Sequence, residues 1–183
     1  MTQYYFTRHG ESQANVANVF AGWMDSPLTE KGRKEALEEA IRLASEETHF
    51  DLIISSPLSR AYDTANIIAK TLGYPLEEIV QLDELKERNM GTYEGLPKDS
   101  LRGHPNDGDA IAEAGGETRA EFATRVQKSF ALIRSKSAKT GKVLIVSHAG
   151  WHKMAVTVLE HKDIEIFHTL PSPENNKVVE FKL

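Results

Sequence analysis

At 183 residues, 40% of them hydrophobic and 27% charged, the chain has the composition of one globular domain that can bury a core without disulfides or a structural metal. It contains no cysteine, which excludes a disulfide framework, a zinc ribbon and a cysteine nucleophile. A net charge of -5 argues against general binding to nucleic acids or anionic membranes. Because no secretory leader pattern and no run of roughly 20 apolar residues is seen, we expect a cytoplasmic protein without a membrane partner.

Strand-like and helix-like hydrophobic patterns alternate along the chain. The expected strands lie at about 4–6, 50–56, 79–82, 143–147 and 176–183, and the expected helices at about 30–46, 58–72 and 118–133. Thr29 and Ser56 are predicted as helix N-caps, with Pro57 at a first helical position, and Thr118 with Glu121 as a capping box. The alternation predicts an α/β fold of three αβα layers, with a mostly parallel sheet and one antiparallel edge strand. We expect residues 1–183 to form a single domain.

Reactive side chains follow the ends of the expected strands. His9 follows the first strand, Arg60 lies in the first turn of the helix after the second, and Glu87 lies just beyond the third. His148 follows the strand at 143–147. Because ligands of open α/β sheets bind outside the carboxyl ends of the strands, we expect these side chains to meet at one edge, together with Arg8.

The chemistry that suits such a cluster is the transfer of an anionic group. Arginine forks match phosphate oxygens and stay charged at any working pH. A neutral imidazole can accept a phosphoryl group, and Arg8, Arg60 and a cationic His148 are expected to lower the pKa of His9 and keep it neutral. Glu87 can donate a proton to the leaving alkoxide and then take one from the attacking water.

The residues that carry this chemistry resemble the histidine phosphatase superfamily, also called phosphoglycerate mutase-like, over essentially the whole chain. The resemblance begins at Arg8-His9-Gly10 with Glu11-Ser12 after it, and the motifs keep the order of that family. The further matching blocks are Asn15, 20–32, 55–65 with Arg60, 84–95 with Glu87, Gly115 to Thr118, and 146–150 with His148.

This resemblance implies a role for each matching residue. His9 would be phosphorylated, Arg8, Arg60 and His148 would complete the phosphate pocket, and Glu87 would be the acid. Asn15 and the backbone of Gly22 and Ala149 would add neutral contacts to the phosphoryl group. No metal or organic cofactor would be needed, and the partner would be a small-molecule phosphate ester.

The family contains both phosphatases and mutases, and this chain departs from the cofactor-dependent phosphoglycerate mutases. Met90 stands where those mutases carry a tyrosine, and their long insertion with an arginine pair is absent, although Lys98 keeps a matching position. A mutase must hold a multiply anionic intermediate and exclude water, which requires more cations and a fuller lid. We therefore expect a metal-independent phosphomonoester phosphatase, with the mutase, which would use 2,3-bisphosphoglycerate, as the alternative.

Substrate specificity is expected to come from a substrate-covering loop region at about 89–116. Its candidate contacts are Tyr93, Lys98, Arg102 and His104. A non-catalytic module that binds phosphorylated ligands is a further hypothesis, which loss of His9 or Glu87 would have indicated. His148 and His152 have the spacing of a zinc-binding helix, but the intervening Ala149 and Gly150 make a metal site an unfavoured interpretation.

Overall fold

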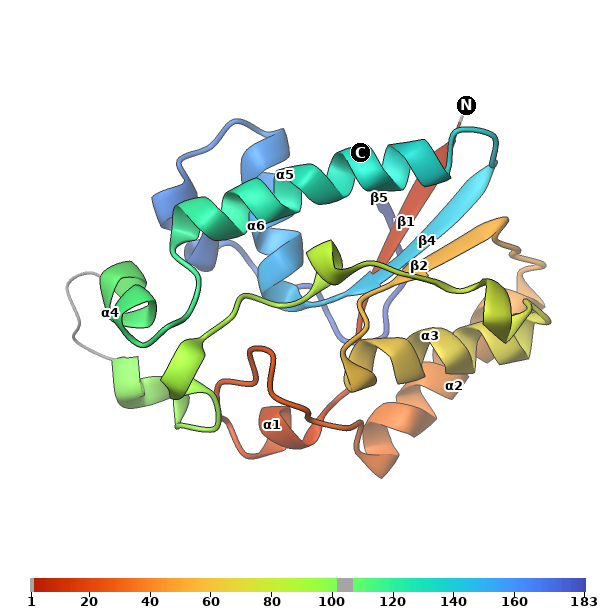
Figure 1. Ribbon diagram of the computed structural model, residues 1–183. Coiled ribbons are helices and arrows are strands. Elements are labelled where there is room, and N and C mark those ends of the chain that lie inside the picture. The colour runs from red at the N-terminus through yellow and green to blue at the C-terminus, as the bar shows by residue number, and fades with distance from the viewer. Residues whose placement is uncertain (1, 102–106) are drawn as a thin grey trace.

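The computed structural model describes residues 2–101 and 107–183 and places a five-stranded sheet at the centre of the fold (Figure 1). The strand order is β3-β2-β4-β1-β5. The strands are β1 (Gln3–Arg8), β2 (Leu52–Ser55), β3 (Val80–Gln81), β4 (Lys142–Ser147) and β5 (Val179–Phe181). β1, β2, β3 and β4 run parallel to one another, and β5 pairs with β1 in the antiparallel direction. The predicted α/β class, the mostly parallel sheet and the antiparallel edge strand are confirmed.

Helices cover both faces of this sheet, as Figure 1 shows with α5 and α6 on one side and α2 and α3 on the other. The helices are α1 (Gln13–Val16), α2 (Glu30–Ser45), α3 (Ser59–Leu72), α4 (Asp107–Glu113), α5 (Arg119–Lys136) and α6 (Ala149–Leu159). Five short 3-10 helices join them: η1 (Leu76–Glu78), η2 (Asp83–Leu85), η3 (Gly91–Tyr93), η4 (Lys98–Leu101) and η5 (Ile164–Thr169). The sequence pattern did not indicate α1, α4 or α6. The first two are too short to show a clear periodicity, and in α6 the glycine at 150 argued against a helix although the structure places it in the first turn.

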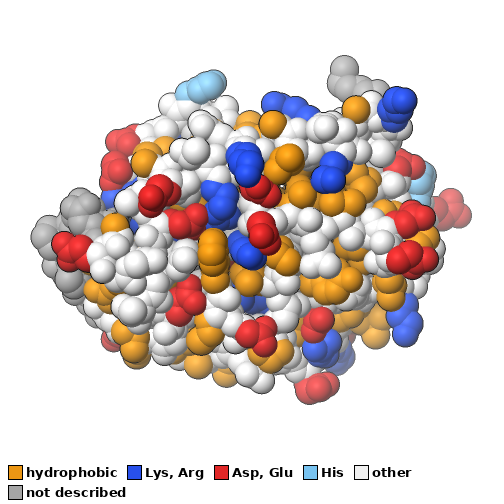
Figure 2. Space-filling model, in the orientation of Figure 1, with side chains coloured by type: hydrophobic (Ala, Val, Ile, Leu, Met, Phe, Trp, Pro, Cys, Tyr) orange, Lys and Arg blue, Asp and Glu red, His pale blue; other side chains and the backbone are white. Residues whose placement is uncertain are grey.

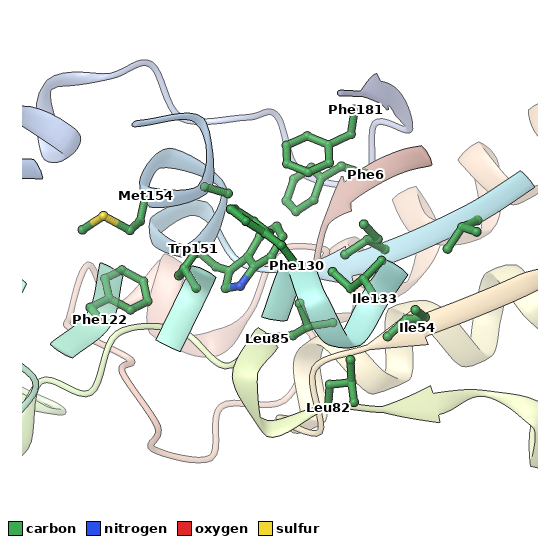
Figure 3. Close-up of a cluster of buried hydrophobic side chains, with 14 of the residues drawn as sticks. Phe6, Ile54, Leu82, Leu85, Phe122, Phe130, Ile133, Trp151, Met154 and Phe181 are labelled. Carbon is green, nitrogen blue, oxygen red and sulfur yellow. The ribbon is translucent and has the colours of Figure 1, made fainter. Parts of the chain in front are cut away.

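Two hydrophobic clusters fill the space between the sheet and its helices. The larger one packs α5 and α6 against the sheet around the fully buried Phe6 and Trp151, whose rings stack with centroids 6.0 Å apart (Figure 3). The smaller one packs α2 and α3 against the opposite face. Residues of β4 alternate between them, with Val143 and Ile145 in the first and Leu144 in the second. The sheet is therefore buried on both faces, which fixes the direction in which its strand ends point.

Two of the three predicted helix starts are confirmed by hydrogen bonds. The Thr29 hydroxyl accepts from the Gly32 amide at 2.9 Å, and Thr118 and Glu121 form a capping box at the start of α5. The prediction for Ser56 is wrong, because α3 begins at Ser59 and its N-cap is Leu58. The Ser56 hydroxyl accepts from the Leu58 amide at 3.3 Å, just before the helix, and also contacts the imidazole of His148, 2.8 Å away.

The sheet order determines which segments meet beyond the strand ends. β1 and β4 are neighbours, and Arg8 is paired with Ser147 at the end of their register. His9 and His148 come next in each strand, so parallel pairing alone sets them side by side. The segments that follow β2 and β3 lie further along the same edge.

The region at 89–116 contains η3, η4 and α4 between its loops. On the face of the molecule seen in Figure 1, positive and negative side chains are interspersed among apolar patches (Figure 2). Within the described ranges, no helix is long and apolar enough to cross a membrane.

Candidate active site

His9 lies at the centre of the strand-end cluster and is 4% exposed. Its Nδ1 lies 2.7 Å from the Gly10 carbonyl oxygen, and because a carbonyl only accepts, Nδ1 carries the proton and donates. The lone pair is therefore on Nε2. Burial lowers the pKa of His9 well below its ordinary value, and the charges of Arg60 and Arg8 lower it further. His9 is a neutral imidazole with its nucleophilic nitrogen defined.

Hydrogen bonds from the C-terminal segment and from α3 hold the backbone around His9. The Asn176 amide donates to the Arg8 carbonyl at 2.9 Å, and the Asn175 side chain donates to the His9 carbonyl at 2.5 Å. On the other side, the Gly10 amide donates to the Thr64 hydroxyl of α3 at 3.1 Å. The loop after β1 is thus held by two segments distant in the sequence, and the imidazole has a fixed support.

His148 is fully buried, with its ring centroid 5.1 Å from that of His9. Burial lowers its pKa well below the ordinary value, and Arg60 and His9 add to the effect. The expectation of a cationic His148 is therefore wrong, because a fully buried imidazole beside Arg60 stays neutral at pH 7. The low pKa of His9 comes from its own burial and from the arginines.

Two arginines bring positive charge to the histidines. Arg60 is 1% exposed and donates to the Gly22 carbonyl at 2.8 Å and to the Met24 carbonyl at 3.2 Å, so it also shapes the 20–25 loop. The half-buried Arg8 donates to the Pro173 carbonyl at 3.4 Å. Burial lowers the pKa of both arginines, and the negative charge of Glu87 opposes this.

Three buried nitrogen atoms in this cluster have no hydrogen-bond partner among the described residues: Arg8 Nε, Arg60 Nε and His148 Nδ1. A buried polar nitrogen without a partner costs free energy, on the order of 1–3 kcal/mol. A bound oxyanion could supply the acceptors that these groups need. The arrangement is typical of a preformed anion pocket.

Glu87 is held by two backbone amides. Its Oε1 accepts from the Arg88 amide at 2.9 Å, and its Oε2 accepts from the Gly150 amide at 3.0 Å, in the first turn of α6. The carboxylate can take this place because residue 150 is glycine: a Cβ there would overlap Oε1 and lie 2.9 Å from the carboxyl carbon. Its acidic neighbours are engaged elsewhere: Glu84 pairs with Lys128 at 2.7 Å, and Glu94 accepts from the Trp23 amide at 2.7 Å.

All of the predicted catalytic groups except His148, which lies buried next to His9, line a cavity of about 490 Å³. Its wall includes Arg8, His9, Arg60 and Glu87, together with the predicted contacts Asn15, Gly22, Lys98 and Ala149. Asn15 uses its Oδ1 to accept from the Ser12 amide at 3.1 Å. Gly22 has a φ of +46°, and a side chain there would overlap the Glu94 carboxylate, so the backbone lies bare at this point of the wall.

The remaining specificity candidates have different outcomes. Lys98 lines the cavity, and burial followed by Arg8 lowers its pKa. Tyr93 is not part of the wall, and its ring packs edge-on against Phe20 with centroids 6.5 Å apart. Arg102 and His104 lie outside the described residues. No group of three potential metal ligands is brought together in the part of the chain that the structure describes.

Several wall residues were missed by reasoning from the sequence. Lys153 faces the cavity from α6, one turn after Ala149, and helical spacing could have found it. Its Nζ donates to the His168 carbonyl at 3.2 Å. Ser56, the partner of His148, carried a misleading capping signal instead. Met90 and Phe20 lie in blocks that carry the family resemblance, whereas the other apolar wall residues gave no signal beyond hydrophobicity: Val19, Leu101, Ile111 and Phe167.

An α/β sheet with two neutral histidines, two arginines and one carboxylate at its strand ends defines a class of protein with an electropositive, histidine-containing anion pocket. The profile of the histidine phosphatase superfamily (branch 1) matches residues 4–183. The chain belongs to this superfamily, which confirms the resemblance.

Similar proteins carry two kinds of names. A phosphoglycerate mutase from Schizosaccharomyces pombe is 36% identical over 163 residues, which cover 84% of this chain and 77% of that one. The structure of a mutant phosphoserine phosphatase from Entamoeba histolytica bound to phosphoserine is 26% identical, with a TM-score of 0.81, covering 100% of this chain and 91% of that one. A mycobacterial glucosyl-3-phosphoglycerate phosphatase in complex with VO3 is 25% identical, with a TM-score of 0.81 and coverages of 98% and 90%.

Proposed function

We propose that the protein is a phosphomonoester phosphatase that acts through a phosphohistidine on His9. The observation that carries this proposal is the geometry of His9, whose Nε2 is free of its proton in a cavity that also holds Arg8, Arg60 and Glu87. The arginines would bind the oxygens of a phosphomonoester and so bring its phosphorus to the imidazole.

The reaction takes two displacements. His9 Nε2 attacks phosphorus, the ester P–O bond breaks, and Glu87 in its protonated form gives a proton to the departing oxygen. Water then attacks the phosphorus of the phosphohistidine and loses a proton to the Glu87 carboxylate. The P–N bond breaks, inorganic phosphate leaves and the neutral imidazole is restored. No metal ion or organic cofactor takes part in these steps.

Two features favour water over a second hydroxyl as the final acceptor. Beside its cations, the cavity wall carries the apolar side chains of Phe20, Met90, Leu101 and Ile111. Met90 stands where the mutases have a polar tyrosine, so the wall offers less for a multiply anionic intermediate. The solved phosphatase structures also match nearly the entire chain. The mutase stays as a second candidate because a mutase relative is 36% identical.

The test compares wild-type protein with a His9→Ala variant in the presence of a chelator. Para-nitrophenyl phosphate and 3-phosphoglycerate are supplied with and without 2,3-bisphosphoglycerate. We expect release of phosphate that requires His9 and is not redirected by bisphosphoglycerate. Conversion of 3-phosphoglycerate to 2-phosphoglycerate with little release of phosphate would establish the mutase instead. Loss of turnover in the chelator would refute the metal-independent mechanism, and no turnover of any kind would favour a binding module.

A further inference from the structure

Arg125 of α5 reaches the backbone of the segment that carries Glu87. Its Nη1 donates to the carbonyls of Glu84 and Lys86 at 3.1 and 2.9 Å, and its Nη2 donates to the Glu87 carbonyl at 2.9 Å. One guanidinium therefore binds three carbonyl oxygens within four residues. A lysine, with a single ammonium group, lacks the flat fork that spans such a set.

Glu117 completes this arrangement from the other side. Its carboxylate accepts from Arg125 Nε at 2.6 Å and from Nη2 at 2.7 Å, and the same Oε2 accepts from the Asn89 amide at 2.8 Å. The side chains of Arg125 and Glu117 are each 15% exposed, so water screens this pair little. The pair thus holds the chain both before and after Glu87.

Aromatic rings restrain the guanidinium itself. Arg125 lies over Phe122 at 4.9 Å and over Trp23 at 5.8 Å. The Trp23 indole also donates to the Glu87 carbonyl at 2.7 Å, so that oxygen receives two hydrogen bonds. Neither Arg125 nor Glu117 belongs to the cavity wall formed by the described residues. Arg125 also contributes to the low pKa of His148 through its charge, an effect that any phosphate ester in the pocket would share. The hydrogen bonds of Arg125 and Glu117 act on the reaction through the segment that they hold.

We infer that Arg125, paired with Glu117, is a positioning residue that aims the Glu87 carboxylate at the leaving-group oxygen. This inference rests on the proposed function, in which Glu87 is the acid. The backbone amide of Arg88 and that of Gly150 set the two carboxylate oxygens, and the first of these amides moves with the segment that Arg125 fixes. A displacement of about 1 Å at a reacting group can lower a rate by roughly 100-fold.

The test uses two substrates whose leaving groups differ in their need for a proton. Para-nitrophenolate leaves without protonation, whereas an alkoxide such as that of 2-glycerophosphate requires an acid. The quantity to compare is kcat/KM, because it reports the steps up to phosphorylation of His9 and not the hydrolysis that both substrates share. For Arg125→Met we expect a loss of about 100-fold on 2-glycerophosphate and of less than about 10-fold on para-nitrophenyl phosphate. Arg125→Lys should show the same substrate-dependent loss, because a lysine cannot replace the three hydrogen bonds of the guanidinium.

Lys128→Met is the matched control, since Lys128 is also on α5, pairs with Glu84 and is 67% exposed. It should change neither kcat/KM by more than about twofold. If Arg125→Met does not fold, as judged by circular dichroism, Glu117→Gln serves in its place and should show a smaller loss with the same substrate preference.

The outcomes separate the inference from the proposed function. Equal losses on both substrates for Arg125→Met would overturn the positioning role. If Glu87→Gln shows the substrate-dependent loss and the Arg125 and Glu117 variants do not, the inference alone is wrong. If the wild-type protein hydrolyses neither substrate, or Glu87→Gln loses both equally, the fault lies in the proposed function or its acid.

Discussion

Replacing Gly150 by alanine should separate the activity of this protein from its stability. The added Cβ would overlap Glu87 Oε1 and lie 2.9 Å from the carboxyl carbon. What it meets is the end of a glutamate side chain, which can rotate away without moving the backbone. The carboxylate would then lose its hydrogen bond from the Gly150 amide, now 3.0 Å long, and leave its place in the cavity.

The expected effect on stability is small and the expected effect on the rate is large. Alanine favours a helix over glycine by up to about 1 kcal/mol, which offsets part of the cost of moving the carboxylate. The free energy of unfolding should therefore change by less than about 1 kcal/mol. A positioned acid contributes roughly 100- to 10,000-fold to the rate, or about 3 to 5 kcal/mol of activation free energy. The loss of kcat/KM on 2-glycerophosphate should fall in that range.

Urea denaturation and steady-state kinetics on the same preparation measure both quantities. Wild-type kcat/KM on 2-glycerophosphate would show that the position of the carboxylate does not matter. A loss of unfolding free energy above about 2 kcal/mol would show that the side chain cannot move aside and that the backbone of α6 is displaced instead. Either result would refute this reasoning.

Two further predictions concern buried imidazoles. Ser56→Ala removes the hydroxyl that pairs with His148 Nε2 at 2.8 Å, so urea denaturation should show a loss of unfolding free energy of about 1–3 kcal/mol. The control Ser59→Ala removes a hydroxyl that bonds Asp25 from a partly exposed position and should cost less than about 1 kcal/mol. Equal effects would contradict the assigned pair. Burial, with a smaller contribution from the charge of Lys153, lowers the pKa of His152 to about 4. As the pH falls from about 6.5 toward 4, His152 therefore becomes protonated in the unfolded chain and stays neutral in the folded chain. Stability should decrease over that window, and His152→Gln should flatten the decrease by up to about 3 kcal/mol; an unchanged pH profile would show that His152 titrates normally.

The sheet and its main helices were predictable because their signals are local. The runs at 50–56 and 143–147 are continuous and largely apolar, which is typical of parallel strands buried on both faces. Thr29 caps its helix through a hydrogen bond from Gly32, a residue only three positions further along the chain. Ser56 carries the same kind of local signal, but α3 begins three residues later, at Ser59. Its hydroxyl also bonds the imidazole of His148, 92 residues away, a partner that a local pattern cannot show.

The candidate site was predictable in its members and less so in their states. Strand ends and the order of motifs were enough to bring His9, Arg60, Glu87 and His148 to one edge. The charge of His148 depends on complete burial, which a sequence does not display. Lys153 was missed because α6, the helix that carries it, was not predicted, so its spacing from Ala149 could not be used. The catalytic roles stay predictions until the kinetic tests are made.

The pairing of β1 with β4, and the bonds from Asn175 and Asn176 to the backbone of Arg8 and His9, also govern when the pocket can exist. During synthesis, His9 is made well over a hundred residues before its neighbours at 148 and 175. Contacts of this sequence separation form late and slow folding. A truncated or half-made chain would carry the nucleophile without its pocket. A formed pocket therefore requires that the chain from β1 to β5 has been made and folded.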